Sequence, residues 1–234
     1  MKNSKPTCHV NVDTFALIGI VRELQDDIIH NRIRHGEVVN EDHVRVRYGV
    51  DAPVARDIVQ QLVTQHFLKF EHKNGGNIAV FHFYEAINLT EQRGLGECLA
   101  LRFSMRTIQP KDFAVCHRLL NRFEDAGSIE DKILFHKKFF SVLYGAWGRE
   151  TIENGTQTYI ARYAKYLRLF WLDTNRLASY QQSLRDILKL CEQGDVDEAC
   201  TELWKQIRGV EEFLIEKLRT VERGMMSEAG LFPT

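Results

Sequence analysis

Basic side chains gather in one stretch of the chain, and basic side chains are what proteins use to contact the phosphates of nucleic acids. Arg45 and Arg47 come first, and Lys69 and Lys73 follow, just before a glycine pair, Gly75-Gly76. The glycine pair is a further candidate for DNA contact, or only a hairpin turn. Arg45 and Arg47 either contact DNA or belong to a solvated helix face, because runs of charge are typical of solvated faces.

The segment that carries these residues contains the start and stop signals of two short helices. The first is predicted over residues 41–48, with Asn40 as N-cap and Gly49 directly after its end. The second begins after Asp51, which can cap it, and tolerates Pro53 in its first turn. Apolar residues at helical spacing give this second helix one buried face.

A hairpin is predicted to follow the two helices. Residues 67–70 and 78–81 are strand-like, and the turn between them is expected over residues 74–77. Helix, tight turn, helix and hairpin together indicate a winged helix-turn-helix, whose second helix fits the major groove of DNA. This fold would place the basic side chains on a nucleic-acid interface.

Composition sets bounds on the remaining possibilities. Hydrophobic residues make up 44% and charged residues 27% of the 234 residues, as in ordinary globular proteins with a core. No apolar run approaches the ~20 residues of a membrane span, and the first residues lack the apolar segment of a secretory signal. The net charge of −1 weakens a nucleic-acid function without excluding it, because one locally basic face suffices.

Neither metal nor catalytic motifs stand out. The five cysteines are scattered and form no CxxC pair, so a disulfide framework or zinc ribbon is not supported, and a reducing cytoplasm is the expected location. GxSxG, HExxH, Walker A and dinucleotide motifs are absent from the sequence. His117 and His136 have no obvious catalytic partner, so the chain is not expected to be an enzyme.

The rest of the chain is predicted to be almost entirely helical. An amphipathic helix over residues 13–31 precedes the winged segment, and residues 84–88 are expected to be a short connector. Beyond it, helices are expected over residues 89–107, 110–126, 128–144, 156–173, 175–192 and 196–223, with a loop at 145–155. The fourth and fifth of these helices are either separate or one continuous helix. The predicted fold class is mainly α: a winged helix-turn-helix domain (13–83) and an antiparallel all-α bundle of six or seven helices (89–223).

These motifs resemble the GntR family of bacterial transcription regulators, in its FadR-like branch with an FCD-type effector domain. The segment GVDAPVARDIVQQL at 49–62 is similar to the family's G-V-S-R-P-T-V-R-E-A-L-x-x-L, and Gly76-Asn77-Ile78 is similar to its wing. In the helical part, the resemblance rests on Glu91-x-Arg93 followed by Glu97, on Phe135-His136 and on Gly194-Asp195.

The departures from the family pattern concern DNA binding. Asp51 and Ala52 replace the family's Ser and Arg, and Asp42 replaces a basic residue. Acidic groups repel phosphates, and a missing Arg can forfeit ~1–3 kcal/mol of base discrimination. Arg56 keeps a DNA-contact position of the family, although it could pair with Asp57 or Asp51 instead.

Family members commonly hold a divalent metal through an Asp or Asn four residues before a His, and two later His residues. Here Lys132 stands four before His136, and the later positions fall at Leu184 and Gln206. A lone imidazole beside an ammonium is a poor metal site, so no metal cofactor is expected.

The resemblance still implies an effector cavity. Its candidate lining residues are Arg93, Lys132, His136, Tyr163 and Gln206, a cationic set that suits a carboxylate. The alternatives are a satisfied core histidine at 136, a buried Arg93–Glu97 pair, and a lysine that reaches water. Aromatic residues at helical spacing could be cavity walls or plain core; they are Tyr159, Tyr163, Tyr166 and Trp204.

The sequence therefore predicts a homodimeric, ligand-responsive transcription regulator that binds double-stranded DNA at an inverted repeat and a small organic acid in its helical domain. The alternative is a dimeric sensor or scaffold whose winged helix no longer reads DNA specifically. The electrostatic potential over the second helix of the winged unit would distinguish them.

Overall fold

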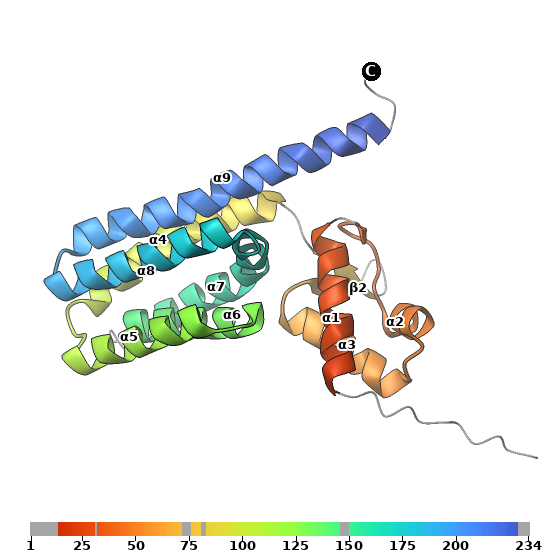
Figure 1. The fold of residues 1–234 in the computed structure, drawn as a ribbon, viewed down its shortest axis with the longest axis horizontal. Helices are drawn as coiled ribbons and strands as arrows, with labels where there is room; N and C mark the ends of the chain where they lie inside the picture. The colour runs from red at the N-terminus through yellow and green to blue at the C-terminus, as the bar shows by residue number, and fades with distance from the viewer. Residues whose placement is uncertain (1–13, 31, 72–75, 81–82, 146–149, 229–234) are drawn as a thin grey trace, which may run out of the picture. The chain divides into compact units, whose positions relative to one another are not determined.

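The elements of the chain fall into two units, residues 1–82 and 83–234 (Figure 1). The computed structural model describes residues 14–30, 32–71, 76–80, 83–145 and 150–228. The first unit contains α1 (Thr14–Ile29), α2 (Glu41–Tyr48), α3 (Ala52–Thr64), β1 (Leu68–Glu71) and β2 (Gly76–Ala79). The second contains α4 (Phe83–Ser104), α5 (Pro110–Asp125), α6 (Ile129–Gly145), α7 (Glu150–Trp171), α8 (Thr174–Gln193) and α9 (Val196–Glu228). The predicted fold class, a winged unit plus an α-helical bundle, is confirmed.

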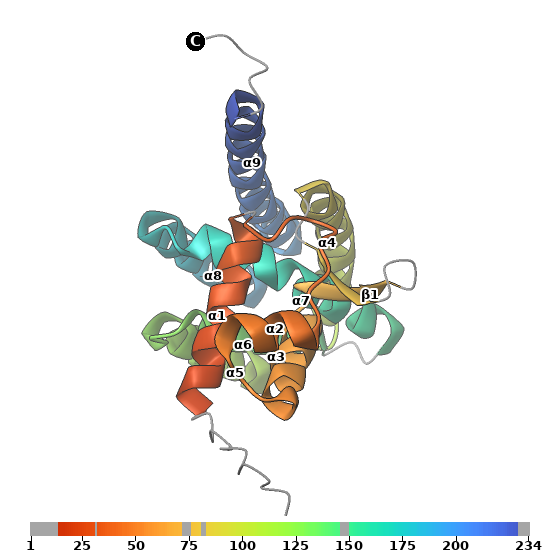
Figure 2. The same ribbon diagram turned by 90° about the vertical axis from the view of Figure 1, so that its right-hand side faces the viewer.

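Capping side chains fix α2 and α3 where the sequence predicted them. The Asn40 side chain accepts a hydrogen bond from the backbone N–H of His43 at 2.8 Å, and Gly49 ends α2 with φ at 67°, a left-handed conformation that favours glycine. The Asp51 carboxylate accepts from the backbone N–H of Val54 at 3.0 Å. The three helices of this unit share one core with the sheet (Figure 2).

The hairpin is offset from its predicted position. β1 and β2 pair antiparallel, with Leu68 opposite Ala79, so Gly76 and Asn77 belong to a strand and the expected turn over 74–77 is wrong there. The other edge of β2 is also bonded: Gly36 N–H donates to Ala79 O at 2.9 Å, and Val39 N–H donates to Asn77 O at 2.8 Å. The segment of residues 36–39, which is remote in sequence from β2, therefore pairs with its second edge and extends β2 toward residue 76.

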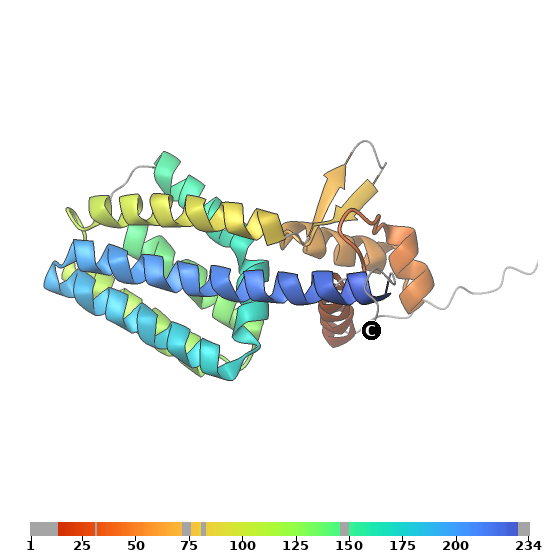
Figure 3. The same ribbon diagram turned by 90° about the horizontal axis from the view of Figure 1, so that it is seen from above.

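The helical unit contains a long antiparallel pair. Figure 3 shows α4 and α9 side by side, with α8 against the opposite side of α9. Gly94 permits the close approach, because a Cβ there would lie under 3.0 Å from three carbons of the Trp204 ring. No described helix has the length and apolar character needed to cross a membrane.

Three expected boundaries in this unit are wrong. Residues 84–88 are the first turns of α4 and not a connector, and residues 150–155 belong to α7 and not to a loop. The last helix runs to Glu228, beyond the expected 223. The helices α7 and α8, whose continuity the sequence left open, are separate, because Asp173 caps α8 by accepting from the backbone N–H groups of Asn175 and Arg176.

A tertiary contact explains the early start of α4. Glu85, in its first turn, accepts hydrogen bonds from Arg162 at 2.7 Å, from the buried ammonium of Lys165 at 2.8 Å and from the hydroxyl of Tyr166 at 2.8 Å, all on α7. Burial alone would raise the pKa of Glu85, but Lys165, Arg162 and Tyr166 outweigh it and lower the pKa to about 2. The ionised carboxylate therefore ties the beginning of α4 to α7.

We expect Glu85→Gln to remove part of the acid sensitivity of the helical unit. A carboxyl with a lowered pKa stabilises the fold above its unfolded value near 4.5, and this contribution is lost as the pH falls toward about 2. At neutral pH the variant should lose roughly 1–3 kcal/mol. Urea unfolding followed by tryptophan fluorescence between pH 6 and about 2.5 measures this, because Trp171 and Trp204 lie on α7 and α9 and the winged unit has no tryptophan in its sequence.

Glu91→Gln is the matched control, because Glu91 is an exposed carboxylate of the same helix. Equal pH profiles for wild type and Glu85→Gln would contradict the assignment.

Candidate nucleic-acid interface and buried polar centre

The outward face of α3 carries Arg56 and Gln60 next to the acidic Asp57. Arg56 is 70% exposed, and its Nε donates to the Glu41 carboxylate at 3.2 Å. Exposed ion pairs of this kind are worth about 0–1 kcal/mol, so a phosphate could replace Glu41 at small cost. The partner that the structure gives Arg56 is Glu41, and neither Asp57 nor Asp51.

The two arginines of α2 have different environments. Arg47 donates to Asp27 at 2.5 Å and to Glu23 at 2.9 Å, and Asp27 is buried at 4% side-chain exposure. Despite the opposing effect of burial, this contact raises the pKa of Arg47, and Arg32 together with Arg47 lowers the pKa of Asp27. Arg47 thus fastens α2 to α1, whereas Arg45 is exposed and pairs with Asp42 at 3.3 Å.

The hairpin supplies little of the predicted interface within the described residues. Lys69 is exposed on β1. Gly76 is buried at the start of β2, where a Cβ would lie 3.2 Å from Val38. Lys73 and Gly75 lie outside the described residues.

In the helical unit, a buried ion pair lies among helices α4, α6 and α7. The Arg93 Nε donates to Glu97 at 2.5 Å, and the side chains are 1% and 0% exposed. The Glu97 carboxylate also accepts from the Tyr144 hydroxyl at 2.9 Å, and the guanidinium carbon of Arg93 lies 4.5 Å from the centre of the Tyr163 ring. Tyr163 in turn shares a hydrogen bond with Thr90 at 3.2 Å. The predicted alternative of an Arg93–Glu97 pair is what the structure shows.

His136 lies nearby in an aromatic enclosure. Its Nε2 is hydrogen-bonded to the Tyr180 hydroxyl at 2.8 Å, and its ring centre is 4.8 Å from that of Phe140 and 5.4 Å from that of Trp171. Burial, helped by the charge of Arg93, lowers the pKa of His136 well below 6.5. The imidazole is therefore neutral at physiological pH and can both donate and accept a hydrogen bond.

Three buried polar atoms around this centre have no hydrogen-bond partner in the described part of the chain: Arg93 Nη1, Trp171 Nε1 and Gln206 Oε1. Gln206 donates through its Nε2 to the Tyr180 carbonyl at 3.4 Å. A hollow of about 310 Å³ between α7, α8 and α9 reaches both Tyr180 and Gln206, with Arg176 and Lys205 nearer the surface. Of the three residues with unpaired atoms, Gln206 lines this hollow, whereas Arg93 and Trp171 do not. Unpaired buried polar atoms are costly, so their occurrence in one domain makes this region the candidate for a binding site.

Comparison with known protein families identifies the family of the helical unit. The FCD domain family matches residues 88–208, which is just over half of the chain and contains the whole buried centre. The chain belongs to the FCD domain family. The match confirms the resemblance to GntR regulators with an FCD-type effector domain. No curated protein matches the chain.

Solved structures share the fold at low sequence identity. E. coli McbR/YncC is 14% identical over 86% of this chain and 98% of that chain, with a TM-score of 0.60. Lar, which controls expression of the Listeria monocytogenes agr system, is 12% identical over 92% and 99%, with a TM-score of 0.61. A putative GntR regulator from Rhodococcus sp. RHA1 is 17% identical over 87% and 99%, with a TM-score of 0.57. These likenesses concern the fold alone.

The residues at the metal-ligand positions of this FCD domain do not fit a metal ion. The Lys132 ammonium donates to the carbonyl oxygens of Phe123 at 2.8 Å and Glu124 at 3.2 Å, so it caps the C-terminal end of α5 and does not join the other candidate effector residues. Leu184 is buried and has no donor atom, and His136 already faces Tyr180. Among the described side chains, no three His, Cys, Asp or Glu residues are grouped to hold a metal.

Sequence reasoning missed three members of the buried centre. Tyr144 could have been found, because His136, Phe140 and Tyr144 recur every four residues and share one face of α6. Tyr180 lies four residues before Leu184 and so shares the face that carries a metal-ligand position. No sequence signal distinguishes Trp171 from an ordinary core residue.

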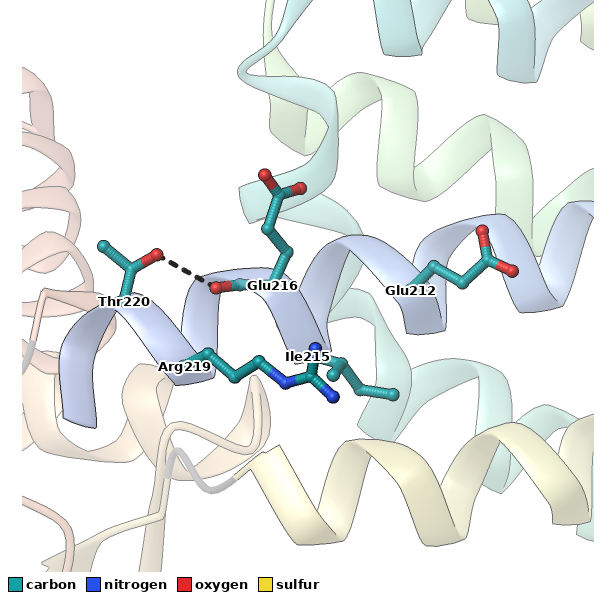
Figure 4. A pocket seen from close by; sticks show the side chains of 5 residues that line it. All are labelled: Glu212, Ile215, Glu216, Arg219 and Thr220. Carbon is teal, nitrogen blue, oxygen red and sulfur yellow. Dashed lines mark hydrogen bonds between the residues drawn. The ribbon is translucent and has the colours of Figure 1, made fainter. Parts of the chain in front are cut away.

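A second hollow, of about 490 Å³, lies on the surface of α9 (Figure 4). Its lining residues are Glu212, Ile215, Glu216, Arg219 and Thr220. All come from one helix, and the Thr220 hydroxyl donates back to the Glu216 carbonyl at 3.0 Å. A single helix does not enclose a ligand, so this hollow is a weaker candidate for a binding site than the buried centre.

We expect Glu97→Ala to destabilise the helical unit by about 3–5 kcal/mol, because it leaves the Arg93 charge and the Tyr144 hydroxyl buried without a partner. Urea unfolding followed by tryptophan fluorescence measures the loss. Glu216→Ala is the control: Glu216 is exposed, lies 3.7 Å from Arg176 and should cost less than about 1 kcal/mol. A similar, small effect of both variants would show that the buried pair adds little to stability.

Proposed function

We propose that the protein is a ligand-responsive transcription regulator, in which the winged unit binds double-stranded DNA and the FCD domain binds a small organic acid. The observation that carries this proposal is the set of unpaired buried polar atoms around Arg93, His136 and Gln206, within a domain whose family is that of an effector domain. A homodimer would present two winged units to an inverted repeat.

The buried centre suggests which effector chemistry it accepts. Among the described residues, Arg93 Nη1 and Trp171 Nε1 are donors without acceptors, and Gln206 Oε1 is an acceptor without a donor. A carboxylate would supply the acceptor oxygens, and a hydroxyl or amine on the same molecule would supply the donor. A small hydroxy or amino acid therefore matches both needs, and the hollow of about 310 Å³ that Tyr180 and Gln206 line would be its way in.

The DNA contacts proposed for the winged unit centre on α3. Arg56 and Gln60 lie on its exposed face, and Arg45 and Lys69 are exposed on neighbouring elements. We leave Arg47 out of the proposed contacts, since Asp27 and Glu23 hold it against α1. Coupling between effector and DNA is limited by the difference in effector affinity between two arrangements of the dimer, typically ~1–3 kcal/mol.

One observation favours a second candidate, a dimeric sensor whose winged helix no longer reads DNA. Arg45, Arg47 and Arg56 each pair with a carboxylate of their own unit, and Asp57 adds a negative charge on α3. Such a face has little net positive charge to attract phosphates.

Fluorescence anisotropy separates the two candidates. We expect the protein to prefer a labelled fragment of its own promoter region over a random duplex of equal length, with affinity that falls steeply between about 50 and 200 mM salt. Arg56→Ala should weaken specific binding by roughly 5- to 150-fold, because it loses a base or phosphate contact. Arg118→Ala, an exposed arginine of α5, is the control. Equal affinity for both duplexes would support the second candidate.

The effector is tested by thermal unfolding against a panel of small carboxylates, hydroxy acids and amino acids. A true effector at 100 times its dissociation constant should raise the melting temperature by roughly 5–10 °C. Gln206→Leu removes the unpaired acceptor and should abolish most of this shift. Gln182→Leu, a variant of an exposed residue of the same hollow, should keep it. An unchanged shift in Gln206→Leu would place the effector elsewhere.

A further inference from the structure

The antiparallel pair of α4 and α9 has a fixed register that brings two cysteines together. Successive turns of α4 meet successive turns of α9 in opposite order. The matched residues are Glu91 with Arg208, Gly94 with Trp204, Cys98 with Cys200, and Arg102 with Asp197. The thiol pair is therefore one turn away from the closest approach of the two helices, which Gly94 makes possible.

Each thiol contacts the backbone of the other cysteine. The Cys98 Sγ lies 3.7 Å from the backbone oxygen of Cys200, and the Cys200 Sγ lies 3.8 Å from the backbone oxygen of Cys98. Each side chain thus reaches across to the other helix, and a disulfide forms between cysteines whose backbones are this closely opposed. Both cysteines are free thiols in this structure.

The two thiols share one environment. Their mutual hydrogen bond raises the pKa of Cys98 and lowers that of Cys200, while burial raises and the charge of Arg102 lowers the pKa of both. Because the two contacts have nearly equal lengths, either thiol can react first, and we take Cys200 as the attacking thiol. The thiols are buried, at 4% and 9% exposure, but lie directly below the exposed ion pair of Arg102 with Asp197.

We propose that Cys98 and Cys200 are an oxidation site, at which a hydroperoxide converts the two thiols to an intramolecular disulfide that locks α4 to α9. This proposal does not depend on the function proposed above. Because α4 begins at the first residue after the winged unit, the disulfide would fix the helix through which the two units are joined in sequence.

The chemistry is balanced in two steps. The Cys200 sulfur attacks one oxygen of ROOH, the O–O bond breaks, ROH leaves and Cys200 becomes a sulfenic acid. The Cys98 sulfur then attacks the Cys200 sulfur, the S–S bond forms, the S–O bond breaks and water leaves. The two thiol protons end in ROH and water, and two electrons pass from the sulfur atoms to the peroxide.

The other described cysteines provide a built-in comparison. Cys116 on α5 and Cys191 on α8 are also buried, and burial raises the pKa of each to about 12. Neither has a lowered pKa or an adjacent arginine among the causes of its shift. They should remain thiols under conditions that oxidise Cys98 and Cys200.

The test uses the full chain with Cys8→Ser, reduced and then exposed to a small excess of hydrogen peroxide or tert-butyl hydroperoxide. After denaturing alkylation, the intact mass should show a loss of about 2 Da and two blocked thiols. Peptide mapping should join the peptides of Cys98 and Cys200, and dithiothreitol should reverse the link.

Two variants make the result decisive. Cys98→Ser should form no internal disulfide and should leave a sulfenic acid on Cys200, which dimedone traps. The double variant with Cys116→Ser and Cys191→Ser should still form the Cys98–Cys200 link. Full alkylation of all four thiols after peroxide, or a link that maps to Cys116 or Cys191, would overturn the proposal.

Discussion

The buried ion pair of Arg93 and Glu97 is the interaction on which the other polar contacts in the FCD domain depend. Removing two charges from water costs several kcal/mol each, and Arg93 and Glu97 recover that cost only through close mutual contact and additional hydrogen bonds. Glu97 is well satisfied, by Arg93 and by Tyr144, whereas one terminal nitrogen of Arg93 is not. The charges of Arg93 and Glu97 therefore cancel, but one hydrogen-bond donor of Arg93 has no acceptor among the described residues. A buried network with an open donor suits a polar ligand better than an apolar one.

Burial, together with the charge of Arg93, also explains why His136 is neutral. A second cation beside Arg93 would be buried without a counter-charge, so the imidazole loses its proton and bonds to the Tyr180 hydroxyl instead. The Tyr180 hydroxyl, the His136 imidazole and the amide of Gln206 then form a set of polar groups without net charge beside Arg93 and Glu97. The winged unit shows a similar balance, since its arginines face carboxylates of their own unit.

Local signals predicted the local structure well. Asn40, Gly49 and Asp51 were sufficient to place α2 and α3, because caps act within one turn. The spacing of Arg93 and Glu97 also indicated their pairing. Two of the failures concern partners that are distant in sequence: the segment near Val38 that extends β2, and the α7 side chains that hold Glu85. The Lys132 contacts, at Phe123 and Glu124, are close in sequence, but no pattern in the sequence points from Lys132 to the end of α5.

The position of Lys132 also bears on which side chains this domain tolerates there. Its ammonium neutralises the partial negative charge at the end of α5. An aspartate substituted there alone would remove the donor to both carbonyl oxygens and would add a like charge at the same helix end. The residue that caps one helix therefore also keeps an acidic side chain out of this part of the domain.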